Sequence, residues 1–419
     1  MRVLVLDGNE NQAVTATRSL RRAGHEVRVG ADTRWSKAGW SRAAAGSFVY
    51  PAPQEDAAGF VARVAEEARR APGTLVLPMT ERTTLPVSAA RETFQAAGAR
   101  LVLPPHETVL RAFDKQQTTR LAESLGVAVP RTTLVETDEQ ARAFASDAAT
   151  RYPVVLKPRT SEELSGAGGV VATGAPAYAR DAGEFVEAYA RVRRRASAVL
   201  AQEFVEGAGV GYFALVREGV LRAEFAHRRL RDVRPSGSGS ALRESTPPDA
   251  RVREAALKIL SALGWHGVAM VEFRVRADGT PVFLEVNGRF WNSLALAVHA
   301  GVDFPALVAR MAERGDVEPQ GPYAAGVRCR WLLGDLRHLV EVWRGAPAGY
   351  AGAYPARWPT LLGFVTPARG TFHDNFQWRD PAPELGDWLD FILRKLPAGI
   401  RKRRATRKDV HAQRGYSLP

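Results

Sequence analysis

Cysteine is almost missing from this sequence, since Cys329 is the single one among 419 residues. An internal disulfide and a cysteine-rich metal site are therefore excluded, and a reducing cytoplasm is the expected compartment. The apolar run within residues 1–8 is too short for a signal peptide, and no run elsewhere is long enough to span a membrane. The dinucleotide fingerprint G-x-G-x-x-G and the Walker loop G-x-x-x-x-G-K-[ST] are also absent.

Acidic residues are fewer than basic ones, and the formal net charge is +13. Residues 394–419 hold nine Lys/Arg and one acid, Asp409, so this basic tail supplies +8 and the other 393 residues carry +5. The cationic character is therefore mainly a property of the tail, and the body is not expected to bind nucleic acid.

Strand-like and helix-like segments alternate at the start of the chain. Residues 3–6, 25–29 and 74–78 have the composition of strands, and helical segments lie between them. This alternation predicts a parallel, doubly wound α/β sheet, which binds ligands at the carboxyl ends of its strands. Two such polar strand ends are residues 7–9 and 80–81.

The chain divides into three predicted parts. We expect an α/β domain at residues 1–105, a second unit at 106–312, and a C-terminal extension with the basic tail at 313–419. Helices are expected near residues 332–343 and 384–396 of the extension.

Two neighbouring strands carry acids within apolar runs. Residues 282–286 are interrupted by Glu285, and Asn287 and Arg289 follow on the same face. A turn at residues 277–280 predicts a hairpin with the preceding strand, which carries Glu272. Two carboxylates and an amide oxygen suit Mg²⁺, and an arginine suits a phosphate. The alternative is a pair of half-buried strands with charges facing water, but an unpaired buried charge is costly.

Two further features lie earlier in the chain. Lys157 ends an apolar strand, and a glycine-bearing loop at residues 165–169 follows, where backbone N–H groups can approach phosphates closely. Residues 202–205 form an apolar strand edge that can offer backbone groups to a purine. Taken alone, the loop is weak evidence of phosphate binding, and the strand is typical of a protein core.

The order of these features is more specific than any one of them. Their order along the chain resembles that of the ATP-grasp superfamily, and the resemblance covers about residues 1–312. The features in this order are residues 114–115, the Lys157 strand, the glycine loop, residues 202–205, Glu272 and residues 285–289. The resemblance implies an α/β pre-ATP-grasp domain, an α+β ATP-grasp domain of two lobes that clasp ATP, and a C-terminal extension. Residues 227–231, the Ser/Gly loop at 235–240 and residues 243–245 resemble a carbamoyl-phosphate-synthetase-like branch of predicted carboxylate–amine ligases, similar to D-aspartate ligases.

The resemblance also implies roles for particular residues. It implies contacts to ATP from Lys115, Lys157, Gly166, Gly168, Gly169, Gln202, Glu203, Phe204 and Val205. It implies that Mg²⁺, or Mn²⁺ in its place, binds Glu272, Glu285 and Asn287. Arg289 and Lys157 take the catalytic roles, with Arg289 on the transferring phosphoryl group. Gly288 departs from the pattern, since proline is frequent at this position in the family.

The basic run at residues 227–231 has two interpretations, a solvated strand or a binding site for an acidic substrate or an acyl phosphate. The candidate substrate residues are Arg228, Arg243 and Asn292.

The predicted function is ATP-dependent carboxylate–amine (C–N) ligation through an acyl phosphate, with release of ADP and phosphate. Because a carboxylate is a poor electrophile, ATP would activate it in a site that neutralises charge and excludes water. The alternatives are an ATP-grasp carboxylase or kinase, or an ATP-binding regulatory protein. The expected partners are small-molecule or peptide carboxylates and amines.

Two other contacts are left open by the sequence: a homodimer, and an anionic membrane. Apolar residues recur at helical spacing before the basic tail, at Leu385, Trp388, Leu389, Phe391, Ile392 and Leu396. An apolar helix face followed by basic residues can bind an anionic membrane surface weakly. The alternative is a helix packed on the core, followed by a solvated tail.

Overall fold

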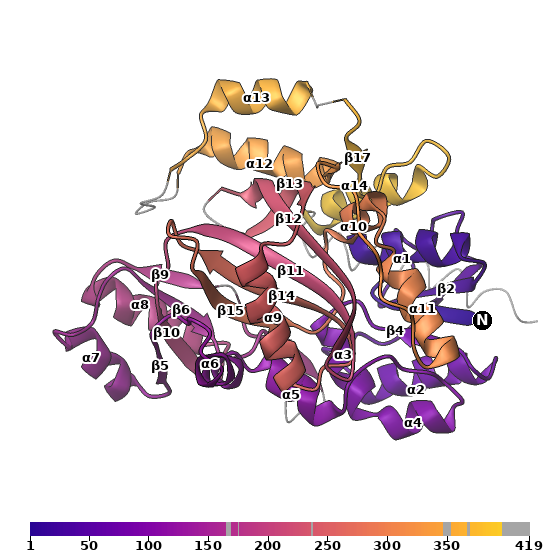
Figure 1. The fold of residues 1–419 in the computed structure, drawn as a ribbon, viewed down its shortest axis with the longest axis horizontal. Coiled ribbons are helices and arrows are strands. Elements are labelled where there is room, and N and C mark those ends of the chain that lie inside the picture. Colours follow the sequence, from indigo (N-terminus) through magenta and orange to yellow (C-terminus); the bar gives the residue numbers. More distant parts are fainter. Residues whose placement is uncertain (165–168, 175, 236–237, 347–352, 367–368, 396–419) are drawn as a thin grey trace, which may run out of the picture.

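The computed structural model describes residues 1–164, 169–174, 176–235, 238–346, 353–366 and 369–395. Figure 1 shows an N-terminal sheet with its helices, a small lobe at the opposite end, and a large sheet between them. Two helices of the C-terminal extension, α12 (Leu332–Arg344) and α13 (Arg357–Val365), form a layer next to the large sheet.

The N-terminal domain is built on four parallel strands in the order β3-β2-β1-β4, as the alternating pattern predicts. Its strands are β1 (Arg2–Val5), β2 (Glu26–Ala31), β3 (Gly46–Val49) and β4 (Leu75–Leu77). Its helices are α1 (Asn11–Arg22), α2 (Ala57–Arg69), α3 (Glu81–Ala89) and α4 (Arg91–Ala96). Apolar residues of β1 and β4 are fully buried, as expected for a parallel sheet covered on both faces.

Two helices, α5 (His106–Phe113) and α6 (Lys115–Ser124), lead into the small lobe. This lobe is an antiparallel sheet in the order β5-β10-β6-β9 with two helices. Its elements are β5 (Thr132–Val135), α7 (Asp138–Ser146), β6 (Val154–Pro158), β9 (Ala177–Ala179), α8 (Ala182–Arg193) and β10 (Val199–Glu203). A separate hairpin, β7 (Glu162–Leu164) and β8 (Val170–Ala172), flanks the predicted glycine loop.

The large sheet has seven strands in the order β15-β14-β11-β12-β13-β16-β17. Its strands are β11 (Ala208–Arg217), β12 (Val220–Arg234), β13 (Ser238–Thr246), β14 (Gly267–Val275), β15 (Pro281–Asn287), β16 (Arg328–Arg330) and β17 (Phe372–His373). The associated helices are α9 (Ala250–Ala262), α10 (Leu294–Ala300) and α11 (Phe304–Arg314), and the last described helix is α14 (Ala382–Lys395). Strands β16 and β17 lie beyond residue 313, so the extension completes the edge of this sheet.

The predicted hairpin about residues 277–280 is confirmed, and the large sheet has a second hairpin earlier in the chain. Strands β14 and β15 pair antiparallel with Glu272 opposite Glu285. Strands β11 and β12 meet at Glu218 and Gly219, which have φ values of 49° and 84°. Two consecutive residues with positive φ form the kind of tight turn that matches the twist of a hairpin, and glycine adopts this conformation without strain.

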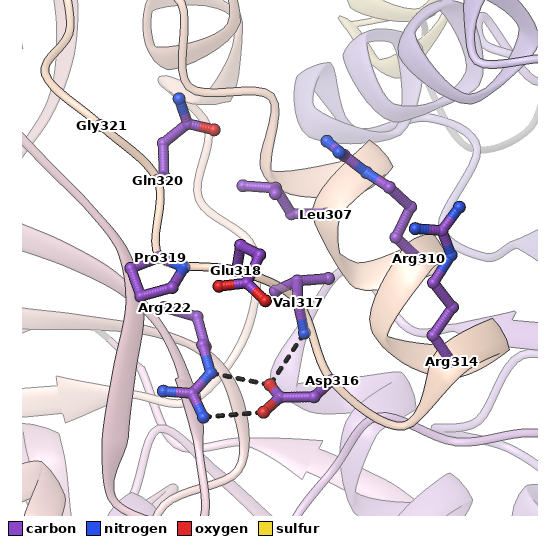
Figure 2. Close-up of a pocket in the computed structure, with 10 residues that line it drawn as sticks. All are labelled: Arg222, Leu307, Arg310, Arg314, Asp316, Val317, Glu318, Pro319, Gln320 and Gly321. Carbon is purple, nitrogen blue, oxygen red and sulfur yellow. Dashed lines mark hydrogen bonds and ion pairs between the residues drawn. The ribbon is translucent and has the colours of Figure 1, made fainter.

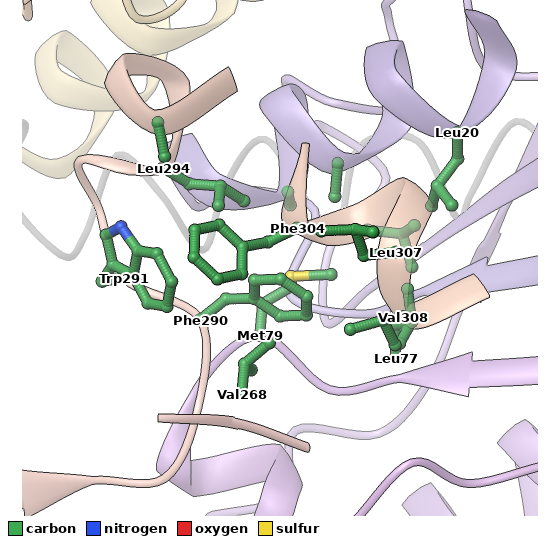
Figure 3. Close-up of a cluster of buried hydrophobic side chains, with 14 of the residues drawn as sticks. Leu20, Leu77, Met79, Val268, Phe290, Trp291, Leu294, Phe304, Leu307 and Val308 are labelled. Atoms are coloured by element: carbon green, nitrogen blue, oxygen red, sulfur yellow. The ribbon is translucent and has the colours of Figure 1, made fainter. Parts of the chain in front are cut away.

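One hydrophobic core is shared by the N-terminal domain and the large sheet (Figure 3). Leu20 and Leu77 from the N-terminal domain belong to the same cluster as Val268, Trp291 and Leu307. The small lobe has a core of its own, whose buried members all lie between residues 135 and 201.

Among the described residues, no single helix has the length and apolarity to cross a membrane. One pair of helices meets the length and composition criteria together, α10 and α11, but it is bent by 84°.

Candidate active site

Strands β14 and β15 place the predicted metal-binding residues side by side. Asn287 Nδ2 lies 3.3 Å from Glu285 Oε1 and donates to it. Arg289 follows the strand and donates from a terminal guanidinium nitrogen to Asn287 Oδ1 at 3.0 Å. Glu272 faces Glu285 across the strand pair. The structure therefore brings together the two carboxylates, the amide and the arginine that the sequence singled out.

The two predicted lysines approach this group from other elements. Lys115 is the first residue of α6, where the Asp114 side chain caps the helix, and its Nζ lies 3.6 Å from Glu285 Oε2. Lys157 is near the end of β6, and burial lowers its pKa, as does the nearby Lys115, while Glu285 and Glu272 act in the opposite direction. Lysine charges from the small lobe and α6 thus converge on the carboxylates of the large sheet.

The carboxylates respond to this surrounding charge in different ways. Burial raises the pKa of Glu272, and the Glu285 carboxylate adds to that effect. Burial also acts to raise the pKa of Glu285, but the charges of Lys115 and Lys157 outweigh it and hold the pKa below its usual value. The side chains remain 23% and 25% exposed, so the pair is open to a ligand. A divalent cation would relieve the repulsion between them.

The structure adds Glu81, which the sequence analysis noted only as part of a polar strand end. It is the first residue of α3 in the N-terminal domain and is 8% exposed. Burial raises its pKa, while the charges of Arg289 and Lys115 act in the opposite direction. Asp7 holds the segment that precedes α3 in place, since its Oδ2 accepts a hydrogen bond from the Met79 backbone N–H at 3.0 Å. The N-terminal domain thus contributes a buried acid whose charge interacts with that of the predicted catalytic arginine.

Arg229 is a second addition, and strand geometry explains why it was overlooked. It donates to Glu272 Oε1 at 3.2 Å, whereas the side chain of its neighbour Arg228 is 62% exposed and pairs with Glu244. Successive side chains of a strand point to opposite faces, so only one of two adjacent arginines can reach the carboxylates. The basic run was evident from the sequence, but which of its side chains face the carboxylates was not.

The other candidate substrate residues lie elsewhere. Asn292 is exposed in a turn before α10. Arg243 is fully buried, and its guanidinium forms an ion pair with Asp374 of the C-terminal extension at 2.8 Å. The structure therefore does not bring Arg228, Arg243 and Asn292 together with the carboxylate group.

The glycine loop falls partly outside the described residues, since Gly166 and Gly168 belong to 165–168. Gly169 contacts the N-terminal domain so closely that an added Cβ would lie 2.0 Å from the Gln54 carbonyl oxygen. The next residue, Val170, donates its backbone N–H to the Pro53 carbonyl at 2.9 Å. The hairpin that flanks the loop therefore rests against the N-terminal domain.

The predicted adenine-binding segment lies at the end of β10. The Gln202 side chain is buried and donates to Thr132 Oγ1 at 3.1 Å. Glu203 is the last residue of the strand, so Phe204 and Val205 lie beyond the β-ladder. Phe204 is 39% exposed, and Val205 is buried.

Gly288 has a packing role in this structure. An added Cβ would lie 2.2 Å from Cη2 and 2.5 Å from Cζ2 of the buried Trp265. Glycine at this position allows the indole to pack directly against the strand that carries Glu285 and Asn287.

A cavity of about 580 Å³ lies apart from these residues (Figure 2). Arg310 and Arg314 of α11 are among its lining residues, and Arg222 pairs there with Asp316. None of its ten lining residues belongs to the group around Glu272 and Glu285, and we place the candidate active site by that group.

Comparisons with known proteins identify the relatives of this chain. The family described as "ATP-grasp in the biosynthetic pathway with Ter operon" matches residues 214–334. The D-alanine–D-alanine ligases of Nitrosospira multiformis and Gloeobacter violaceus are each 30% identical over 218 residues, which is 48% of this chain and 66% and 69% of theirs. A carbamoyl phosphate synthase large chain from Deinococcus deserti is 30% identical over 207 residues, which is 46% of this chain and 18% of its own length.

Among solved structures, an L-amino acid ligase from Bacillus licheniformis superposes with a TM-score of 0.57 and 19% identity, covering 76% of this chain and 74% of that one. The chain spans less than two thirds of the length of some curated relatives, so these matches establish the family and the fold rather than a substrate. The predicted two-lobed architecture with an α/β N-terminal domain is confirmed. The chain belongs to the ATP-grasp superfamily.

Proposed function

We propose that the protein is an ATP-dependent carboxylate–amine ligase that forms an acyl phosphate and releases ADP and phosphate. The main support is a group of charged side chains that come from separate parts of the fold and suit phosphoryl transfer. These are Lys115, Lys157, Arg289 and the Glu272–Glu285 pair. The matched D-alanine–D-alanine ligases and the structural similarity to an L-amino acid ligase also favour C–N bond formation.

The residues present fit a hard divalent cation. Glu272, Glu285 and the Asn287 amide oxygen would hold Mg²⁺ or Mn²⁺, and oxygen donors of this kind suit either ion. Among the described residues no three His, Cys, Asp or Glu side chains form a metal site, so the nucleotide phosphates would complete the coordination. When bound, the cation would neutralise phosphate charge.

The other residues would orient the reactants. Lys115 and Lys157 would hold the ATP phosphates. Arg289 would stabilise the transferring phosphoryl group with its planar guanidinium, and afterwards the oxyanion that forms when the amine attacks the acyl phosphate. The hairpin that flanks the glycine loop would shield this intermediate from water, since it rests on the N-terminal domain.

Glu81 suits the amine substrate. It is a buried acid that interacts electrostatically with Arg289, and it comes from the N-terminal domain rather than from the ATP-binding lobes. A carboxylate in this place would attract the ammonium form of an amine and hold its nitrogen near the activated carboxyl group. The N-terminal domain would thereby help to choose the amine.

An ADP-release screen over pairs of carboxylates and amines tests the function, with mass spectrometry of the products. Condensed product with one ADP and one phosphate per turnover is expected, and Glu285→Ala should nearly abolish it. Glu187→Ala, at an exposed position on α8, is the control for loss of an acid. Stoichiometric AMP and pyrophosphate, or full activity in folded Glu285→Ala protein, would refute the proposal. Turnover with bicarbonate alone would indicate a carboxylase instead.

A further inference from the structure

Strand β11 has two guanidinium groups above its first turn-free glycine, Gly209. A Cβ added at this residue would lie 3.8 Å from Arg274 Nη1 and 3.9 Å from Arg229 Nη1. The two arginines come from β14 and β12, the strands on either side of β11. They therefore approach one point over the strand, where glycine leaves the surface bare. We call Arg229 and Arg274 the arginine pair.

Contacts with the protein hold both guanidinium groups in place. Arg229 donates to Glu272 Oε1 at 3.2 Å, and Arg274 Nη1 donates to the Gly207 carbonyl oxygen at 3.0 Å. Within the described part of the chain, these are the hydrogen bonds that the two side chains form. Because a guanidinium has five N–H donors, each group keeps several donors for a ligand.

The surroundings of the arginine pair are rich in positive charge. Burial raises the pKa of Asp232, while the charges of Arg229 and Arg274 act in the opposite direction. Burial lowers the pKa of Lys157, and the charge of Arg274 adds to that effect. Three cations thus lie close enough to influence one another or the same acids beside Glu272. An oxyanion between the two guanidinium groups would relieve their repulsion.

The arginine pair lies between the predicted adenine-binding segment and the candidate metal-binding carboxylates. Gly209 closely follows residues 202–205 along the chain. It pairs with Arg274, which lies two residues beyond Glu272 on β14. A nucleotide that reached from residues 202–205 to Glu272 would therefore pass over Gly209. The phosphate nearest to its nucleoside is the α-phosphate.

We propose that Arg229 and Arg274 form a subsite for the α-phosphate of the nucleotide. The planar guanidinium groups would donate to its non-bridging oxygens. The inference rests on the nucleotide binding of the proposed function, and it adds two residues to the lysines already assigned to the phosphates. Because ATP and ADP both carry this phosphate, the subsite would bind substrate and product alike and would act on KM for ATP more than on kcat.

A second source of an oxyanion is the carboxylate substrate, if it carries another anionic group. The position of Gly209 favours the nucleotide, because β11 begins directly after the predicted adenine-binding segment. The two sources differ in what they predict for nucleotide affinity measured without the other substrates.

Isothermal titration calorimetry of the full chain with adenosine, AMP and ADP, in buffer with EDTA, tests the proposal. Arg274→Leu should lower the affinity for AMP and ADP by about tenfold, because hydrogen bonds to a charged group are lost, and should leave the affinity for adenosine unchanged. Arg229→Leu should have the same effect, and it gives a second reading if circular dichroism shows that Arg274→Leu is unfolded. Arg344→Leu, which removes an exposed arginine from an ion pair on α12, is the control and should bind all three as the unaltered protein does.

The outcomes separate this inference from the ligase proposal. Unchanged affinity for AMP and ADP in both folded variants would overturn the subsite and leave the ligase function standing. An equal loss for adenosine would also overturn it, since the arginines would then act on the nucleoside. So would an effect confined to KM for the carboxylate substrate, or a lack of AMP and ADP binding by the unaltered protein. Loss of AMP and ADP affinity alone, in a protein that condenses no carboxylate with any amine, would support the subsite and refute the ligase function.

Discussion

Replacing Asp374 with alanine probes the connection between the C-terminal extension and the large sheet. The Asp374 carboxylate and the Arg243 guanidinium are both fully buried, with guanidinium–carboxylate distances of 2.8 and 2.9 Å. Cys329 Sγ donates to the same carboxylate at 3.1 Å. In the Asp374→Ala variant, Arg243 would keep its hydrogen bond to Ser240 but lose its counter-ion.

The expected loss of stability is large because the remaining charge cannot reach water. Breaking a buried ion pair by removing one partner costs about 3–5 kcal/mol. Urea unfolding followed by tryptophan fluorescence and by circular dichroism would measure this loss, and coincident transitions would justify a single free energy of unfolding. Glu254→Ala, which removes one partner of an exposed pair on α9, should change stability little.

Replacing both partners sharpens the test. Arg243→Met together with Asp374→Leu removes both charges and fills the space with apolar atoms, so most of the stability should return. A loss below about 1 kcal/mol in Asp374→Ala, or a double variant no more stable than that single variant, would refute the reasoning from burial.

Three further predictions concern charge at other sites. Arg289→Lys keeps the positive charge but loses the planar guanidinium, so kcat should fall while nucleotide affinity, measured by calorimetry, changes little. Glu81→Gln should raise KM for the amine substrate more than KM for ATP in steady-state kinetics. Burial raises the pKa of Glu384 from 4.5 to about 7, so the folded protein binds more protons than the unfolded chain between these values, and stability falls as pH rises through this window. Glu384→Gln should remove that decline and add up to roughly 3 kcal/mol at pH 8 in urea titrations.

Each of these results can fail in a recognisable way. Unchanged kcat in Arg289→Lys would make the arginine structural. A larger effect of Glu81→Gln on ATP than on the amine would place Glu81 at the nucleotide. A Glu384→Gln protein with the same pH dependence of stability as the unaltered chain would show that Glu384 does not titrate in this window.

Local patterns predicted the parts of the site that lie close together in the sequence. Glu285, Asn287 and Arg289 occupy one strand and its continuation, and Glu272 lies on the hairpin partner, so alternation and a turn were sufficient to place them. The identification of Lys115 and Lys157 needed the order of motifs, because no local feature brings α6 and β6 to the same carboxylates.

The missing parts depend on tertiary contacts. The charges of Glu81 and Arg289 interact only because the N-terminal domain packs against the large sheet. Arg229, and not the predicted Arg228, lies at the carboxylates. A run of basic residues does not show which side chains of β12 point to which face of the sheet. Arg243 was considered a substrate residue, yet its partner Asp374 lies 131 residues later in the sequence. No pattern of spacing could pair them.

The distribution of hydrophobic cores has a consequence for how the molecule unfolds. Because the N-terminal domain and the large sheet share one cluster of buried side chains, neither can unfold without exposing part of that cluster, and the two should behave as one cooperative unit. The small lobe keeps its buried residues within 135–201 and can swing or unfold without exposing any of that shared set. Lys157 belongs to the lobe, while Glu272, Glu285 and Glu81 belong to the cooperative unit. The site is therefore assembled between two parts of the chain that have separate hydrophobic cores, and the distance between its charges depends on how the two parts are oriented.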